Sequence, residues 1–423
     1  MIPRMSTYLR VVVFGILLGI MMSFVPLFWR NLPQEGKITQ LDGQVFGGDF
    51  VTFYLAGKIF SENRNSLYDL EFQRATRKAF LDQNHVEKSP ELPFVYPILV
   101  AAVFSLLAHL PFITAFFLWS FCSLLFGGGL FVALLRQLGL ISTRQIPFII
   151  LLTLGFPPFG INTLMGGQLS AIGLAIFSAI FIALLRDRHT LAGFILSFSY
   201  YKPPLFLISL ICLVITQPLR FLKGFLSGAT LLIGLSLLAG GVSGLYSYIG
   251  AASRYLYGRE VLSGVQLPPR QGAGLFGALV QMIPHPTASA LVLLMLYGIV
   301  IWMFITVFRP ISQQHQMVTY ALLCCASVGL SVQCIRYDLA MMLVPFALIF
   351  RFQSALSLGY RFVLFGLIGA FYGEFCFREI PVADGFYNLS SFLFLPLIGI
   401  LLLIARGDYL TSEEEKGNGA DVI

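Results

Sequence analysis

The chain has 423 residues, of which 57% are hydrophobic and 11% are charged, and its formal net charge is +7. This composition excludes a soluble globular enzyme and a disordered chain, so we interpret the protein as an all-α polytopic membrane protein. A hydrocarbon core about 30 Å thick takes about 20 helical residues per crossing, and the long uncharged stretches therefore predict roughly 12 crossings. Helices are required because lipid-exposed backbone groups must be paired within their own segment.

The basic residues are dispersed in ones and twos at the ends of the apolar runs. This distribution indicates cytoplasmic loops that follow the positive-inside rule, and it argues against a nucleic-acid partner. The six cysteines lie in or beside apolar segments without CxxC spacing. We therefore expect no disulfide framework, no zinc site and no cofactor, while a requirement for a soluble metal ion stays open.

The first apolar run is flanked by Arg4 and Arg10, which predict an N-terminus on the cytoplasmic side and a retained membrane anchor. The following segment, residues 30–93, is then a large outer loop. Residues 30–91 carry eight Lys or Arg against nine Asp or Glu, a balance consistent with an exported loop.

The chain as a whole is interpreted as one transmembrane domain, residues 1–405, which includes this outer loop, followed by a cytoplasmic tail, residues 406–423. A second outer loop is predicted at 241–288. The stretch Leu92–Leu135 must cross the membrane an odd number of times, yet Leu110–Pro111 resembles a hairpin, so the number of crossings there stays open.

In the first outer loop, two glycines precede Asp49, and apolar residues then recur at three- and four-residue intervals from Phe50 to Phe60. This pattern predicts a short amphipathic helix that lies along the membrane face. Asp49 could cap this helix, could act in chemistry, or could do both. A second helix is predicted just after it, capped by Ser66 or Asp69.

Only about 12 residues, Thr190–Tyr201, separate the inner Arg188 from Lys202-Pro203-Pro204, which is short of the ~20 that a full crossing needs. We predict a short helix, a proline-broken turn and a second helix back to the inner side. Lys202 would then lie in the outer half of the membrane, where a lysine needs an anionic partner. The alternative is a lysine that snorkels to the outer surface.

Short motifs follow one another in a fixed order along the chain: Asp49-Phe50, Tyr54, Ala56-Gly57, Leu67-Tyr68-Asp69, Phe94-Val95-Tyr96-Pro97, Leu118-Trp119, Gly167-Gln168 and Lys202-Pro203. Together they resemble glycosyltransferase family 87, the polyprenyl-phosphate-mannose-dependent mannosyltransferases of the GT-C fold. The resemblance covers about residues 45–220, with weaker agreement through Gln271 and over the segment Arg336–Pro345.

The resemblance implies a transferase at the outer side of the cytoplasmic membrane, with a catalytic acidic residue in the first outer loop that maps onto Asp49. The chemistry agrees: a lipid phosphate is a weakly basic leaving group that needs charge stabilisation, whereas the acceptor hydroxyl needs a base. Direct attack on C1 would invert the anomeric centre. We expect Lys202 to bind the donor phosphate, followed by Arg336, Arg270 and, as a distant fourth, His285.

The candidates for binding the sugar and the acceptor lie near predicted outer helix ends. The neutral hydrogen-bonding candidates are Tyr54, Tyr96, Asn162, Gln168 and Gln271, and the acidic candidate is Asp338. For the arginines, interfacial anchoring or pairing with Asp338 is an equal alternative. The family often has a histidine near the position of Tyr337 and Asp338, and this chain has none there. The partners would be a polyprenyl-phosphate-sugar donor, a glycolipid or polysaccharide acceptor and membrane lipid.

Two other classes of protein fit parts of the pattern. A membrane transporter or lipid flippase would explain the helix count and the broken hairpin, since half-helices often form midplane binding sites. Against it, the sequence has no evident repeat halves, and its acidic residues lie almost wholly outside the apolar runs. A non-catalytic scaffold would leave Asp49 and Lys202 replaceable.

Overall fold

The computed structural model describes residues 37–40, 43–86, 89, 92–256, 272–283, 285–307, 313–373, 380–382, 385–387 and 389–405. The α-helices in this part of the chain are α2 (Phe50–Glu62), α3 (Leu70–Gln83), α4 (Ile98–Ala108), α5 (Phe112–Ser123), α6 (Gly129–Gln137), α7 (Ile146–Leu154), α8 (Ser170–Leu184), α9 (His189–Ser197), α10 (Leu207–Thr216), α11 (Leu219–Leu256), α12 (Leu275–Met282), α13 (Pro286–Val307), α14 (Gln313–Gly329), α15 (Leu343–Phe352), α16 (Leu358–Gly373) and α17 (Leu389–Ala405).

Shorter helical turns interrupt or join these helices. The 3-10 turns are η1 (Arg64–Ser66), η3 (Thr143–Gln145), η5 (Phe198–Tyr201), η6 (Pro203–Leu205), η8 (Arg336–Met342) and η9 (Gln353–Ala355), and the π-helical turns are η2 (Leu124–Gly128) and η4 (Pro158–Met165). The strands β1 (Ile380–Val382) and β2 (Gly385–Tyr387) form an antiparallel hairpin in which Pro381 lies opposite Phe386. The described chain is otherwise helical, as the composition predicts.

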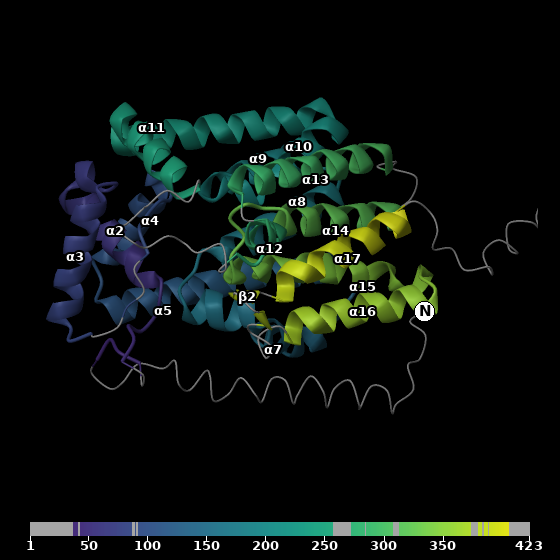
Figure 1. The fold of residues 1–423 in the computed structure, drawn as a ribbon, viewed down its shortest axis with the longest axis horizontal. Helices are drawn as coiled ribbons and strands as arrows, with labels where there is room; N and C mark the ends of the chain where they lie inside the picture. Colours follow the sequence, from purple (N-terminus) through teal and green to yellow (C-terminus); the bar gives the residue numbers. More distant parts are fainter. Residues whose placement is uncertain are drawn as a thin grey trace, which may run out of the picture.

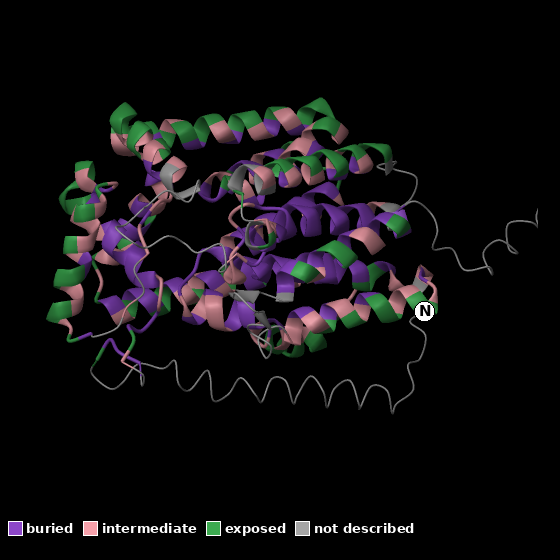
Figure 2. Cartoon of the chain, viewed as in Figure 1, coloured by how far each residue is buried: buried purple, intermediate pink, exposed green. Residues whose placement is uncertain are grey.

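The helices form two groups, a bundle and an end module that consists of α2, α3 and α4. In Figure 1, the bundle helices α11, α13, α14, α15, α16 and α17 lie along the long axis, and the end module lies at one end of the bundle. The helix α14 is in the interior, where it packs against α15 and α17. Every residue from Met317 to Leu330 is buried, so neighbouring helices surround this part of α14 on all sides (Figure 2).

The protein is a helical membrane protein by the length and apolar character of its helices. Within the described ranges, two helical stretches are long enough to span a bilayer, Phe112–Gln137 with 26 residues and Leu219–Ser253 with 35 residues. A third span results if Thr143–Leu154 and Pro158–Met165, which meet at 74°, are counted together. Shorter apolar helices of 10–17 residues make up most of the remaining bundle.

The stretch from residue 92 to 135 contains one helix that is long enough to cross on its own. The segments α5, η2 and α6 run on as one apolar helix, whereas α4 has 11 residues and ends at the His109–Pro111 turn. The helix α4 packs against α2, and a Cβ added at Gly57 of α2 would lie 2.4 Å from the Phe104 carbonyl oxygen of α4. The hairpin at Leu110–Pro111 therefore joins the end module to the first long helix of the bundle.

The prediction for α2 was right about the helix and wrong about its surroundings. The helix begins at Phe50, but its residues from Phe50 to Gly57 are all buried, so no apolar face is left to lie along a membrane. The amphipathic helix is α3, which lies against α2. Asp69 caps α3 as predicted, since its carboxylate accepts from the amides of Glu71 and Phe72.

The proline-broken hairpin is confirmed. The helix α9 continues into η5, the chain breaks at Lys202, and η6 leads to α10. Further along, α11 contains a kink at Gly241, whose φ of 65° and ψ of −173° interrupt the helix before it continues to Leu256. The predicted second outer loop at 241–288 thus contains helical segments before and after residues 257–271, which lie outside the described residues.

Glycines fix α9 tightly against α11. A Cβ added at Gly224 of α11 would lie 1.9 Å from the Thr190 carbonyl oxygen, and one at Gly193 of α9 would lie 2.0 Å from the Phe221 carbonyl oxygen. Backbones that approach this closely have no room for side chains, which is the usual role of small residues between membrane helices. Because Lys202 follows the end of α9 by only a few residues, this contact also fixes the position of the Lys202 backbone.

We expect Gly224→Ala to destabilise the protein by about 1–3 kcal/mol, the typical cost of overpacking, because α9 must move away from α11. Gly234→Ala on the same helix is the matched control, since no atom lies within 4 Å of its added Cβ. Alanine is the better helix former by about 1 kcal/mol, so the control should be neutral or stabilising. Thermal unfolding of the purified protein in detergent distinguishes them, and equal melting temperatures would contradict the packing account.

Candidate active site

Two glycine turns bring distant parts of the chain together at the site. Gly47 and Gly48 precede α2 with φ of 76° and 51°, and Gly167 precedes α8 with φ of 65°. A Cβ added at Gly167 would lie 2.4 Å from the Phe50 Cβ, and one at Gly48 would face Gly166 at 3.6 Å. Glycine supplies both the left-handed backbone and the close approach, so the two turns pack directly against each other.

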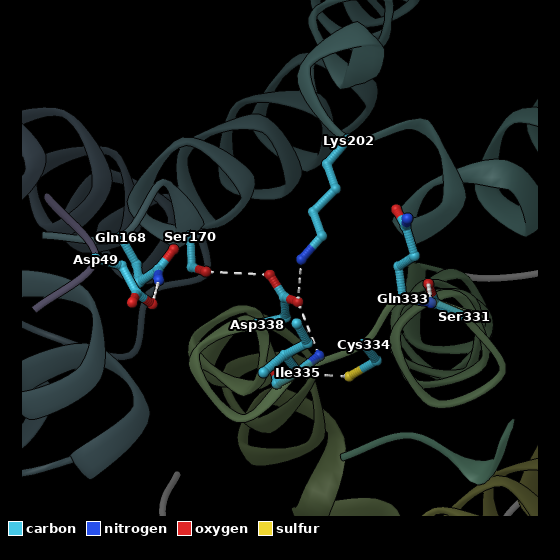
Figure 3. Close-up of polar contacts among 9 residues, drawn as sticks. All are labelled: Asp49, Gln168, Ser170, Lys202, Ser331, Gln333, Cys334, Ile335 and Asp338. Atoms are coloured by element: carbon cyan, nitrogen blue, oxygen red, sulfur yellow. Dashed lines mark hydrogen bonds and ion pairs between the residues drawn. The ribbon is translucent and has the colours of Figure 1, made fainter. Parts of the chain in front are cut away.

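This packing places Asp49 against Gln168. The Gln168 Nε2 donates a hydrogen bond to the Asp49 Oδ2, which links residues 119 positions apart (Figure 3). Asp49 occupies the N-cap position of α2, but its side chain makes no capping hydrogen bond, so the capping interpretation of its carboxylate is wrong. Its carboxylate is directed across the interface between the two glycine turns instead.

Gln168 is held in place by its surroundings and keeps one polar atom unused. The residue is 3% exposed, and its Oε1 has no hydrogen-bond partner among the described residues. The helix α5 supports the turn before it, since the Trp119 Nε1 donates to the Gly167 carbonyl at 3.1 Å and the Ser120 hydroxyl donates to the Leu164 carbonyl at 2.9 Å. A buried amide oxygen without a donor is a candidate contact for a ligand hydroxyl.

A second group of polar side chains begins at Ser170, on the first turn of α8. The Ser170 hydroxyl donates to the Asp338 Oδ1 at 3.1 Å, and the Lys202 Nζ donates to the Asp338 Oδ2 at 2.5 Å (Figure 3). The Ile335 amide also donates to Oδ2, at 2.9 Å. Asp338 is 1% exposed. A buried carboxylate is costly unless it is paired and hydrogen-bonded, and these three donors meet that requirement.

Lys202 is buried and paired rather than snorkelling. It is 7% exposed, and besides Asp338 its ammonium lies 4.8 Å from the centroid of the Tyr337 ring. The prediction that this lysine needs an anionic partner is confirmed, and the partner is Asp338, 136 residues away. The snorkelling alternative is wrong.

We define the polar series as Asp49, Gln168, Ser170, Asp338 and Lys202. These side chains come from the start of α2, the start of α8, η8 and the break after η5, and each is linked to the next by a hydrogen bond or by the short Gln168–Ser170 segment (Figure 3). A carboxylate at one end and an ammonium at the other are therefore joined by these contacts and by the Gln168–Ser170 segment.

Burial raises the pKa of the Asp49 carboxyl to about 6, while the Arg77 charge and the Gln168 hydrogen bond oppose this rise. A carboxyl in this range is ionised near neutral pH and still basic enough to accept a proton.

The other predicted site residues have varied surroundings. The Tyr54 hydroxyl donates to the Leu110 carbonyl at 2.9 Å, which ties α2 to the turn before α5. Tyr96 packs on Phe53 with ring centroids 5.2 Å apart, and its main-chain carbonyl accepts a hydrogen bond from the Tyr68 hydroxyl at 2.8 Å. Asn162 and Arg336 are partly exposed, on η4 and η8, two elements that pack together. Arg270 and Gln271 lie outside the described residues, and His285 is exposed at the start of α13.

Two residues near the site were missed by the sequence analysis. Ser170 bridges α8 to Asp338, and a lone serine at a helix start gives little signal by itself. Arg77 of α3 is 8% exposed and acts on Asp49 electrostatically. Its signal was available: Arg77 falls at helical spacing between Gln73 and Phe80–Leu81, on the face that packs inward.

Lys202→Met should destabilise the protein by about 3–5 kcal/mol, because Asp338 would be left buried without its cation. The double variant Lys202→Met with Asp338→Asn removes both charges and should recover most of that loss. Thermal unfolding of the three proteins measures both effects. A single variant as stable as the wild type would show that the pair is not buried as described.

Comparison with known proteins identifies the family. Residues 94–334, more than half of the chain, match the model of glycosyltransferase family 87, while no curated protein and no solved structure matches. The matched segment contains Gln168, Ser170 and Lys202, whereas Asp49 and Asp338 lie outside it. The resemblance noted in the sequence is thus confirmed, and the chain belongs to glycosyltransferase family 87.

Proposed function

We propose that the protein is an inverting glycosyltransferase that moves mannose, or a related sugar, from a polyprenyl-phosphate donor to a hydroxyl of an envelope glycolipid or polysaccharide. The reaction takes place on the outer face of the cytoplasmic membrane. The single observation that supports this best is the polar series, which joins a carboxylate with an elevated pKa to a buried ammonium in a member of this family.

In the proposed reaction, Asp49 is the general base. The acceptor hydroxyl attacks C1 of the donor sugar, the bond from C1 to the phosphate oxygen breaks, and the hydroxyl proton passes to the Asp49 carboxylate. Attack from the face opposite the phosphate inverts the anomeric centre. The hydrogen bond from Gln168 orients the carboxylate and leaves its other oxygen to receive the proton.

The departing phosphate gains negative charge as the C1–O bond breaks, so cations fixed in place stabilise the transition state more than the bound donor. Lys202 is the first such cation, and its pairing with Asp338 holds the ammonium in position before the donor arrives. Because Asp338 already neutralises one positive charge, a second cation is needed. Arg336, two residues before Asp338, is that second cation, and Arg270 is a third candidate.

The sugar and acceptor hydroxyls would be bound by neutral groups around the series. Gln168 is best placed, since its buried Oε1 can accept from a hydroxyl beside the base. Tyr54, Tyr96, Asn162 and Gln271 remain the further neutral candidates, and Asp338 remains the acidic one. No three-residue cluster of His, Cys, Asp or Glu that could hold a metal occurs within the described residues.

The proposed architecture is a GT-C-like bundle with roughly 12 crossings, of which the described residues supply two or three spans long enough on their own. The end module would lie on the outer side, over the ends of the bundle helices. Membership of a glycosyltransferase family favours this function over a transporter or a flippase.

Asp49→Asn should reduce sugar transfer by about 10²-fold or more, since removing a general base typically costs 10²–10⁴-fold. Asp69→Asn is the matched control: it lies in the same loop region, and asparagine can still cap α3. Membranes carrying each variant are incubated with radiolabelled polyprenyl-phosphate-mannose and a lipid extract, and label in a new product is counted. Wild-type turnover by the Asp49→Asn protein would remove Asp49 as the base.

The transfer rate should increase as pH rises through about 6, because the base must be ionised and burial raises the pKa of Asp49 to about 6. A profile of the transfer rate at saturating donor between pH 4.5 and 8 measures this increase. A rate that stays constant over this range, as expected if the controlling carboxyl had the ordinary aspartate pKa of about 4, would contradict control by the buried Asp49 carboxyl.

A further inference from the structure

Arg77 is a buried arginine that joins three parts of the end module. Its Nη1 donates to the Thr52 hydroxyl at 3.0 Å, and its Nη2 donates to the Ser89 hydroxyl at 2.5 Å. The Thr52 hydroxyl in turn donates to the Leu92 carbonyl at 3.2 Å. Arg77 therefore connects α3, α2 and the segment that leads to α4.

The connection reaches the turn that carries Asp49. The Thr52 amide donates to the Asp49 main-chain carbonyl at 3.0 Å, so the residue clamped by Arg77 is also part of the first turn of α2. A planar guanidinium that bonds two hydroxyls fixes both the distance and the orientation of its partners. Movement of Arg77 would accordingly be transmitted to Asp49.

Among the described residues, Arg77 is also the charged side chain whose electrostatic effect lowers the pKa of Asp49. The start of α8 contributes the neutral Gln168, α4 has no charged residue, and the titratable residue of α5 is Cys122. On α2, Lys58 and Glu62 lie more than two turns from Asp49. The other charged residues of α3 are more exposed than Arg77; they are Glu71, Arg74, Lys78 and Asp82.

We propose that Arg77 is a positioning residue of the transfer site, which clamps the first turn of α2 through Thr52 and acts on Asp49 with its positive charge. The inference rests on the proposed function, since Arg77 acts through the Asp49 carboxylate and not on the substrate. A neighbouring cation favours the ionised carboxylate and so opposes the effect of burial. Without it, Asp49 would hold its proton at the pH where a base is required.

The test is an infrared titration of the full chain in lipid nanodiscs. The band of the protonated Asp49 carboxyl is assigned by its loss in Asp49→Asn, and its midpoint is read in each variant. Arg77→Gln removes the charge but retains an amide that can donate to Thr52, and it should raise the midpoint by about one pH unit or more. The matched control Lys78→Gln removes an exposed charge from the neighbouring position of α3 and should leave the midpoint unchanged.

A folded Arg77→Gln protein with the wild-type midpoint would overturn the proposal. If that variant does not fold, Arg77→Lys replaces it: a retained charge should keep the midpoint near the wild-type value, and a rise of about one unit would overturn the proposal as well. A merely structural role would lower the melting temperature without moving the midpoint. Wild-type sugar transfer by Asp49→Asn would refute the proposed role of Asp49 as the base, whereas the infrared midpoints decide the role of Arg77 separately.

Discussion

The turn at Gly47–Gly48 packs against the turn at Gly166–Gly167 without any intervening side chain, and the position of Asp49 depends on that contact. With a side chain at Gly167, the start of α2 would be displaced through Phe50, and Asp49 would lose its contact with Gln168. The contact also joins the end module to the bundle, because α2 belongs to the former and α8 to the latter. A flexible connection between these two groups could not hold a base to the accuracy that transfer chemistry requires.

The segment Gln168–Ser170, at the start of α8, organises both ends of the site. Gln168 holds Asp49 on one side and Ser170 holds Asp338 on the other, so two residues that flank the N-cap of one helix relate the base to the buried ion pair. A buried ion pair contributes little net stability, since desolvation offsets most of the attraction. Its use here is in placement: Asp338 fixes the ammonium of Lys202, and the glycine contact between α9 and α11 fixes the backbone that carries it.

Local patterns in the sequence predicted the elements that local physics determines. Helical spacing predicted α2, and the prolines after Lys202 predicted the broken hairpin, because both depend on a few neighbouring residues. The partners of the charged residues could not be predicted, since Lys202 meets Asp338 over 136 positions and Asp49 meets Gln168 over 119. The burial of α2 was missed for the same reason: α3 and α4 cover a face that the sequence pattern assigned to the membrane.

The most direct test of the account is an electron cryomicroscopy structure of the Asp49→Asn protein bound to polyprenyl-phosphate-mannose. The account predicts density for the donor along the polar series, with the sugar beside residue 49 and the phosphate within hydrogen-bond distance of the Lys202 ammonium. A donor bound elsewhere, with its phosphate remote from Lys202 and its sugar away from residue 49, would contradict the claim that these side chains form one active site.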